Sequence, residues 1–353
     1  MNLNRLLPVA TLLALTAFAW SGSDYYTGLA VKIMIYAVFA LSLQLLVGGA
    51  GLVSLGHAAF FGIGAYAAAL LSPQSEAASL WWLLPAALLA AAAYAALTGA
   101  LALRTRGVYF IMVTLAFAQM AYYVFHDTKV GGGSDGIYLY FRPQAYIAGW
   151  LPFDLDQGNA YYFFVLACLA LTWGFLAMLR RSPFGAALAG IRINEQRMQA
   201  AGYSTYPYKL AAYVIGAALA GLAGFLFALK DGFVTPELLA WEQSGLVLLM
   251  VILGGMGSLG GAVLGTATLV LLQELFQSQA LFGDYARHWH LPLGLAIIAL
   301  VAALPDGLAG LPSQWRRRRA RRAAGTTAVS TPPATSAATA KPLPLPIQGE
   351  PHA

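Results

Sequence analysis

Apolar segments long enough to cross a lipid bilayer recur along this chain of 353 residues. A membrane-spanning helix needs about 20 predominantly apolar residues, and in lipid its backbone must satisfy its own hydrogen bonds. Segments of this kind lie at residues 6–20, 29–47, 52–71, 80–103, 107–125, 159–179, 209–229, 244–276 and 289–304. Only 10% of the residues are charged, against about 25% in soluble proteins. The sequence therefore predicts an all-α integral membrane protein, built as a polytopic helix bundle.

The formal net charge of +6 does not indicate a nucleic-acid-binding protein. Six positive charges lie in one cluster after the last apolar segment, at Arg316, Arg317, Arg318, Arg319, Arg321 and Arg322. Such a cluster anchors the cytoplasmic side of a membrane protein and can contact anionic lipid. Cys168 is the only cysteine, so neither an intrachain disulfide nor a thiolate metal site can form. We expect the membrane as a partner, no nucleic acid, and no metal or cofactor bound by this chain.

The distribution of basic residues predicts the orientation of the chain. With the N-terminus in the cytoplasm, 15 of the 20 lysines and arginines fall on the cytoplasmic side: Arg5, Arg104, Arg106, Arg180, Arg181, Arg192, Arg197, Lys209, the six arginines of the cluster, and Lys341. This is the bias that the positive-inside rule describes. Residues 1–23 also have features of a signal peptide, but we expect an uncleaved first transmembrane helix at 1–24 and cytoplasmic termini.

Two apolar segments are interrupted by glycines. The segment 244–276 is too long for one crossing, and a hairpin or re-entrant pair that turns near Gly257 keeps the arginine cluster inside, which gives about 8 to 10 spans. A similar interruption lies at residues 48–56, and both contain Ser-Leu-Gly, at Ser54–Gly56 and Ser258–Gly260. Paired broken segments can indicate an internal repeat that flanks a transport path. The alternative is that the glycines only allow close helix packing.

A polar, basic segment at residues 180–209 separates two long apolar ones. Ser182 and Pro183 are suited to begin a helix, and Gly202 is suited to end it in a left-handed conformation. Within one helix over 183–201, Arg192 and Glu195 share a face. We expect this amphipathic helix to dock a partner on the cytoplasmic side, or alternatively to be a linker helix on the membrane surface.

The remaining segments are loops and a tail. The loop 126–158 contains Gly131, Gly132, Gly133, Ser134, Asp135 and Gly136, which we interpret as a flexible outward turn that can contact an external partner. Its spacing matches neither a phosphate-binding loop nor an EF-hand. The tail is rich in Ala, Thr and Pro, which is typical of disorder. We therefore divide the chain into a first helix at 1–24, a transmembrane domain at 25–305 and a basic, then disordered, cytoplasmic tail at 306–353.

The residues that carry charge favour a transporter driven by another subunit. An ion-coupled carrier usually needs an ionisable group at mid-membrane, yet the 14 carboxylates lie in loops or near the ends of spans, and only His57 is well inside one. The sequence contains no Gly-Lys pair, so it has no Walker A loop. No catalytic set converges on one membrane depth. We expect no enzyme, and ATP to be used only by partner subunits.

Several separated motifs resemble one family. They are Gly51–Ala69 (GLVSLGHAAFFGIGAYAAA), Arg104–Leu115 (RTRGVYFIMVTL), Gly132–Ile137 (GGSDGI), Arg181–Tyr203 (RSPFGAALAGIRINEQRMQAAGY) and Leu253–Gly265 (LGGMGSLGGAVLG). In this order they resemble the LivM-type permeases of bacterial branched-chain amino acid ABC importers. The resemblance covers about residues 25–305, and urea permeases share much of the fourth motif.

The resemblance implies a set of partners and sites. The partners are a LivH-like permease subunit that forms a heterodimer with this chain, two cytosolic ABC ATPase subunits and a periplasmic amino-acid-binding protein, in the bacterial inner membrane. The coupling residues would be Ala187, Gly190, Arg192, Asn194, Glu195, Arg197, Gly202 and Tyr203. With the glycine-broken segments, the expected path residues are Ser54, Gly56, His57, Gly257 and Ser258. We expect inward movement of branched-chain amino acids by alternating access; the alternatives are a permease for urea or short-chain amides and an ion-coupled amino acid carrier.

Overall fold

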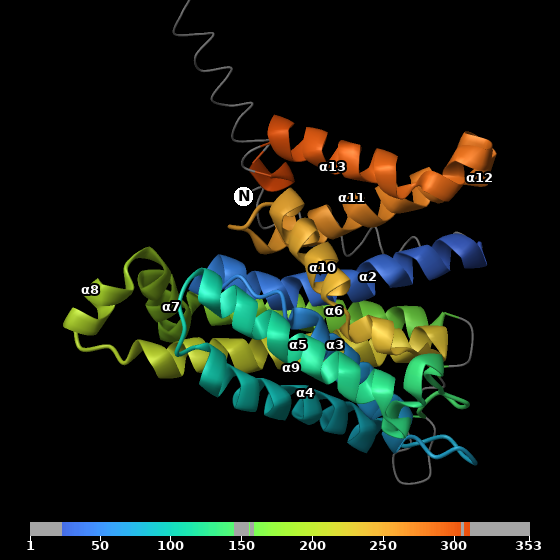
Figure 1. Ribbon diagram of the computed structural model, residues 1–353, viewed down its shortest axis with the longest axis horizontal. Coiled ribbons are helices and arrows are strands. Elements are labelled where there is room, and N and C mark those ends of the chain that lie inside the picture. Colours follow the sequence, from blue (N-terminus) through green and yellow to red (C-terminus); the bar gives the residue numbers. More distant parts are fainter. Residues whose placement is uncertain (1–22, 145–154, 156–158, 305–306, 311–353) are drawn as a thin grey trace, which may run out of the picture. The chain divides into compact units, whose positions relative to one another are not determined.

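The computed structural model describes residues 23–144, 155, 159–304 and 307–310, and most of them are helical (Figure 1). The α-helices are α2 (Asp24–Gln44), α3 (His57–Leu71), α4 (Leu80–Ala102), α5 (Val108–Asp127), α6 (Ala160–Arg181), α7 (Pro183–Ile193), α8 (Glu195–Ala200), α9 (Thr205–Asp231), α10 (Trp241–Gly254), α11 (Leu259–Gln277), α12 (Gln279–Phe282) and α13 (His290–Ala303). The π-helical segment η1 (Leu45–Ala50) continues α2. The expected helix at 6–20 and the arginine cluster lie outside the described residues.

Among the described residues, seven helices are long and apolar enough to cross a membrane. They are α2 with η1, α4, α5, α6, α9, α11 and α13. Three further apolar helices are shorter: α3 has 15 residues, α10 has 14 and α7 has 11. The predicted all-α, polytopic fold is confirmed.

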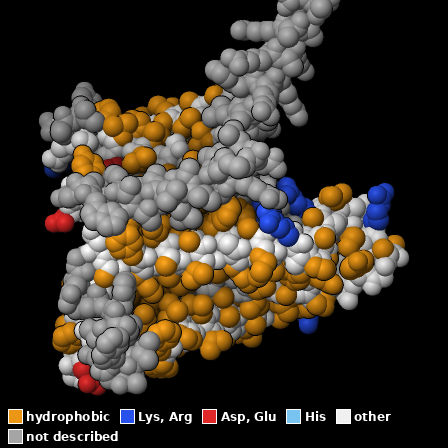
Figure 2. Space-filling model, turned by 180° about the vertical axis from the view of Figure 1, so that it is seen from behind, with side chains coloured by type: hydrophobic (Ala, Val, Ile, Leu, Met, Phe, Trp, Pro, Cys, Tyr) orange, Lys and Arg blue, Asp and Glu red, His pale blue; other side chains and the backbone are white. Residues whose placement is uncertain are grey.

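Side-chain type varies with position on the surface (Figure 2). Hydrophobic side chains cover the flanks of the helices, as lipid contact requires, and lysines and arginines gather at the end that carries α7 and α8. We call this the basic end. Its arginines are Arg104 and Arg106, which follow α4, Arg180 and Arg181 in the last turn of α6, Arg192 in α7 and Arg197 in α8.

Close contacts between small residues hold the centre of the bundle together. Helix α9 packs against α2, α3 and α4. A Cβ atom added to Gly224 of α9 would lie 1.8 Å from the carbonyl oxygen of Phe61, and one added to Gly64 of α3 would lie 2.2 Å from that of Gly221. The two backbones can approach this closely only because glycine occupies these positions, as is common in membrane helix pairs.

The predicted break of segment 244–276 into two helices is confirmed. Helix α10 ends at Gly254, Gly255 has a positive φ of 109°, and α11 begins at Leu259. Ser258 caps α11 by accepting a hydrogen bond from the Gly261 amide at 2.9 Å. Near the turn the helices touch through backbone, because a Cβ on Gly265 would lie 2.0 Å from the Met250 carbonyl oxygen.

Short elements connect the long helices. They are the 3₁₀ turns η2 (Lys129–Gly131), η3 (Gly133–Asp135), η4 (Pro236–Leu239) and η5 (Gly283–His288), and the strands β1 (Ile137–Tyr138) and β2 (Phe233–Val234). A further 3₁₀ turn, η6 (Leu308–Gly310), follows α13. The two strands pair antiparallel, with Ile137 opposite Val234. This pairing fixes the loop after α5 to the loop after α9.

Candidate functional site

The polar segment 183–201 forms two helices, so the expected single helix is wrong. Helix α7 ends at Ile193, Asn194 has an extended backbone (φ −157°, ψ 100°), and α8 begins at Glu195. The Asn194 side chain accepts a hydrogen bond from the Arg197 amide at 2.9 Å. Asn194 is therefore the N-cap of a new helix, a position that asparagine favours. In Figure 1 the two helices lie at the left end of the long helices.

The outer boundaries of the segment are as predicted. The Ser182 hydroxyl accepts from the Gly185 amide at 3.3 Å, and Pro183 takes the first helical position. At the other end Gly202 has a φ of +89°. The Gly202 and Tyr203 amides donate to the carbonyls of Gln199 and Met198, which is the hydrogen-bond pattern of a Schellman motif.

Glu195 is bonded within the chain. Its Oε1 accepts hydrogen bonds from Lys209 Nζ at 2.7 Å and from Thr205 Oγ1 at 2.9 Å, both at the start of α9. Partial burial raises the pKa of Glu195, but these two hydrogen bonds and the charges of Lys209 and Arg106 outweigh it and hold the pKa below its ordinary value of 4.5. Glu195 thus joins α8 to α9 as a carboxylate.

Apolar contacts hold α7 in place, while other side chains of the segment face outward. Ala187, Leu188 and Ile191 are buried, and α7 packs on α6, α9 and η1. Gly190 leaves room for Met198, because a Cβ there would lie 2.7 Å from the Met198 sulfur. By contrast Ile193 is 84% exposed, and Arg192, Arg197, Gly202 and Tyr203 are also exposed. The exposed set mixes cations with apolar groups.

The basic end also holds the two glycine breaks. Arg192 Nη1 donates to the Gly48 carbonyl of η1 at 2.5 Å, and Arg180 Nη2 donates to the Gly257 carbonyl between α10 and α11 at 3.2 Å. Gly257 is exposed and Ser258 is partly exposed. The sequence did not predict these contacts of Arg180 and Gly48. Its only indication was that Arg180 lies in a basic segment and Gly48 in a glycine-rich one.

Three expected path residues lie in the core of this chain. Ser54 and His57 have no exposed surface, and Gly56 is buried. His57 Nε2 is 2.8 Å from Ser42 Oγ, which itself donates to the Phe39 carbonyl at 2.6 Å.

A third serine extends this buried polar cluster. Ser244 of α10 accepts from the Ala58 amide at 2.8 Å, and the Ser54 hydroxyl accepts from the Gly56 amide at 3.2 Å. These contacts join α2, the start of α3 and α10 at one point. Gly56 cannot carry a side chain, because a Cβ would lie 2.3 Å from the Thr114 carbonyl oxygen. Ser42 and Ser244 were not among the predicted residues.

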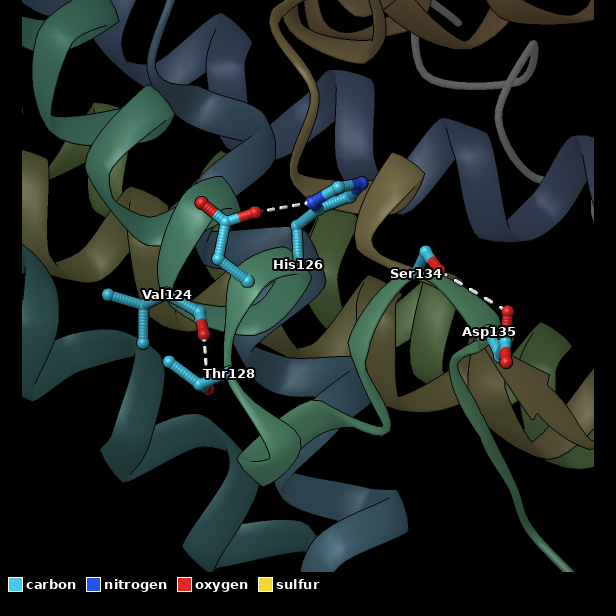
Figure 3. Close-up of polar contacts among 6 residues, drawn as sticks. Val124, His126, Thr128, Ser134 and Asp135 are labelled. Carbon is cyan, nitrogen blue, oxygen red and sulfur yellow. Dashed lines mark hydrogen bonds and ion pairs between the residues drawn. The ribbon is translucent and has the colours of Figure 1, made fainter.

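The glycine-rich turn after α5 has a defined hydrogen-bonded structure (Figure 3). Thr128 Oγ1 donates to the Val124 carbonyl at 2.5 Å, and Ser134 Oγ donates to Asp135 Oδ1 at 3.3 Å. His126 Nδ1 lies 2.7 Å from Asp127 Oδ1. Gly132, Gly133 and Gly136 have positive φ. Over the residues that the structure covers, no three His, Cys, Asp or Glu side chains come close enough to hold a metal ion.

The bundle of long apolar helices defines a class, the multi-pass membrane protein. Residues 25–303 match the family described as branched-chain amino acid transport system / permease component, and the chain belongs to this family. The match covers nearly all of the described helices.

Relatives in several organisms agree. The chain is 34% identical over 323 residues to the high-affinity branched-chain amino acid transport system permease protein LivM of Escherichia coli K12, covering 86% of this chain and 74% of the relative. Identity to the LivM of Salmonella typhimurium LT2 is 33% over the same shares. A probable LivM of Methanocaldococcus jannaschii is 26% identical over 161 residues, 43% of this chain and 47% of the relative. No solved structure matches significantly.

Proposed function

We propose that this chain is the permease subunit of an ATP-binding-cassette importer that moves branched-chain amino acids into the cell. The substrate class comes from the names of the relatives, which are high-affinity branched-chain amino acid permeases. ATP is used by separate ATPase subunits, and this chain binds no cofactor of its own. Urea is the closest alternative substrate, because urea permeases share the motif around Arg181–Tyr203.

The observation that carries the proposal is the compact α7–α8 segment at the basic end. It is capped at both ends, packed on η1, α6 and α9, and tied to α9 through Glu195, so a force on α8 is transmitted to the bundle. A permease without a Walker A loop needs such an element to receive work from an ATPase. The positive-inside rule places the basic end in the cytoplasm, where the ATPases are.

We further propose the following assembly. The chain lies in the bacterial inner membrane with both termini cytoplasmic. It pairs with a LivH-like permease subunit, α7–α8 contacts one of two cytosolic ATPases, and a periplasmic binding protein delivers the amino acid to the opposite end. The turn after α5 belongs to that opposite end. ATPase dimerisation would shift α7–α8 and reorient the helices by alternating access.

The test is uptake of labelled leucine into proteoliposomes. The vesicles hold this chain with its partner permease and ATPases, with binding protein outside and ATP inside. We expect uptake that requires both ATP and the binding protein, and that excess valine or isoleucine inhibits while urea does not. Uptake driven by an ion gradient without ATP would replace the importer with a carrier, and inhibition by urea alone would replace the substrate.

A further inference from the structure

We propose that Arg192 and Arg180 form a two-point clamp that fixes α7 to both glycine-broken segments, so that these three elements move as one body during transport. The inference rests on the proposed function, because it assigns the route by which work received at α7–α8 enters the membrane helices. It changes the role of Arg192, which the resemblance gave as a coupling residue: its guanidinium donates to a carbonyl within this chain.

The first point of the clamp joins α7 to the end of α2. Arg192 Nη1 donates to the Gly48 carbonyl at 2.5 Å, and the Arg192 stem covers Gly51, where a Cβ would lie 3.1 Å from Arg192 Cγ. Gly51 has a φ of +71° and ends η1, so the Gly48 carbonyl lies in the last turn of a helix. Carbonyls there have no donor from their own helix, and an arginine supplies one.

The second point joins the end of α6, next to the start of α7, to the turn between α10 and α11. Arg180 is in the last turn of α6, three residues before α7 begins, and its Nη2 donates to the Gly257 carbonyl at 3.2 Å. A Cβ at Gly185 would lie 2.4 Å from the Leu179 carbonyl oxygen, so the start of α7 is packed tightly on the end of α6. Arg180 therefore moves with α7.

The two points are not independent, because the glycine breaks also touch each other. A Cβ at Gly48 would lie 2.5 Å from the Met256 carbonyl oxygen. The backbone of η1 thus contacts the backbone of the turn between α10 and α11, and each of these two segments also accepts a hydrogen bond from one of the arginines. A displacement of α7 must carry both breaks, and through them α2 and α10, whose buried serines hold the start of α3.

The experiment is a distance measurement between spin labels in the assembled transporter. The native Cys168 is replaced by alanine, and cysteines for labelling are placed at Ala189, an exposed residue of α7, and at Met256, which is 46% exposed. Distances are recorded by pulsed electron resonance without nucleotide and with a non-hydrolysable ATP analogue. Uptake of leucine per ATP hydrolysed is measured for the unlabelled R180M/R192M variant. R104M, which removes an exposed arginine of the same end, is the control.

We expect the distance between the labels at residues 189 and 256 to be the same in both nucleotide states, and its distribution to broaden in the labelled R180M/R192M variant. Uptake per ATP should fall at least about fivefold in that variant, the lower end of typical coupling between sites, and remain unchanged in R104M. A nucleotide-dependent change in this distance in an actively importing transporter would overturn the clamp, even if the double variant failed to assemble. So would uptake per ATP in R180M/R192M equal to that of R104M. Absence of ATP-dependent uptake in the unmodified transporter would instead refute the proposed function.

Discussion

The contact between Glu195 and Lys209 permits a quantitative test of how the polar segment is held. The side chains are 24% and 8% exposed, respectively, and their charged atoms are 2.7 Å apart. The change we propose is Glu195→Gln, which keeps the size of the side chain and a bond to Thr205 but removes the charge that faces Lys209. Lys209 would then remain as a buried ammonium without its counterion.

The expected loss follows from burial. Hydrogen bonds to charged groups contribute about 1.5–3 kcal/mol, and removing one partner of a fully buried ion pair costs about 3–5 kcal/mol. Because Glu195 is partly exposed, we expect E195Q to lower the free energy of unfolding by about 2 kcal/mol, a value between exposed and buried pairs. In a K209M background no ammonium is left unpaired, so E195Q should there cost less than about 0.5 kcal/mol.

The assay is thermal unfolding of the purified chain in detergent for the four members of this double-mutant cycle, with ATP-dependent uptake measured in parallel. E242Q, an exposed carboxylate at the start of α10, is the control and should match the unmodified chain. We expect E195Q to reduce uptake per ATP while membrane insertion and binding-protein affinity are retained. Equal destabilisation by E195Q in both backgrounds would refute the coupling between the two charges. Unchanged uptake would refute a role of the Glu195–Lys209 ion pair in transport.

Four further outcomes are expected. Gly224→Ala should destabilise the bundle by about 3 kcal/mol or prevent folding, because its Cβ would lie 1.8 Å from α3 backbone, whereas Gly174→Ala, with open space around it, should be neutral in the same thermal assay. Gly202→Ala should cost about 1 kcal/mol through its φ of +89° alone, since nothing lies near its Cβ. Ile193→Asp should weaken co-purification with the ATPases without lowering the melting temperature, because the exposed apolar group is replaced where only a partner would cover it. Because the pKa of Glu195 is lowered in the folded chain, the stability contributed by its bonds to Lys209 and Thr205 is fully present above the ordinary pKa of 4.5 and is lost as the pH falls through the lowered pKa. The melting temperature should therefore show no titration from Glu195 between about pH 5 and pH 8, and a pH titration of the melting temperature checks this.

The helices could be predicted from the sequence because lipid leaves the backbone few alternatives. Each apolar segment must bond to itself, so its length and its polar borders identify it. The glycine breaks could also be predicted, because glycine is the residue that most easily adopts the positive φ that ends a helix, and Gly255 and Gly51 adopt it. What could not be read was the backbone that each glycine faces: nothing in the sequence links Gly224 to Phe61 or Gly48 to Met256.

The site was harder to predict because its contacts join distant parts of the chain. Asn194 lies where a continuous helix pattern runs through, and only its preference for N-cap positions, followed by the acidic Glu195, indicated the break. The resemblance to the permease family implied that Glu195 contacts an ATPase, and nothing in the sequence indicated that Lys209 and Thr205 at the start of α9 donate to it within this chain. His57 was recognised as unusual within an apolar segment, whereas its neighbour Ser42 gave no signal of its own.

The two Ser-Leu-Gly motifs acquire a meaning when their surroundings are compared. In each case a helix ends at a glycine with positive φ, a serine follows three residues later, and a new helix begins: Gly51 and Ser54 precede α3, and Gly255 and Ser258 precede α11. The two breaks meet at the basic end, where Arg192 of α7 donates to the Gly48 carbonyl and Arg180 of α6 donates to the Gly257 carbonyl. Bending a bundle costs the least free energy at a helix break, because the backbone hydrogen bonds of the helix are already interrupted there. Because two such breaks lie next to one polar segment, a small displacement of that segment can move α2, α3, α10 and α11 together.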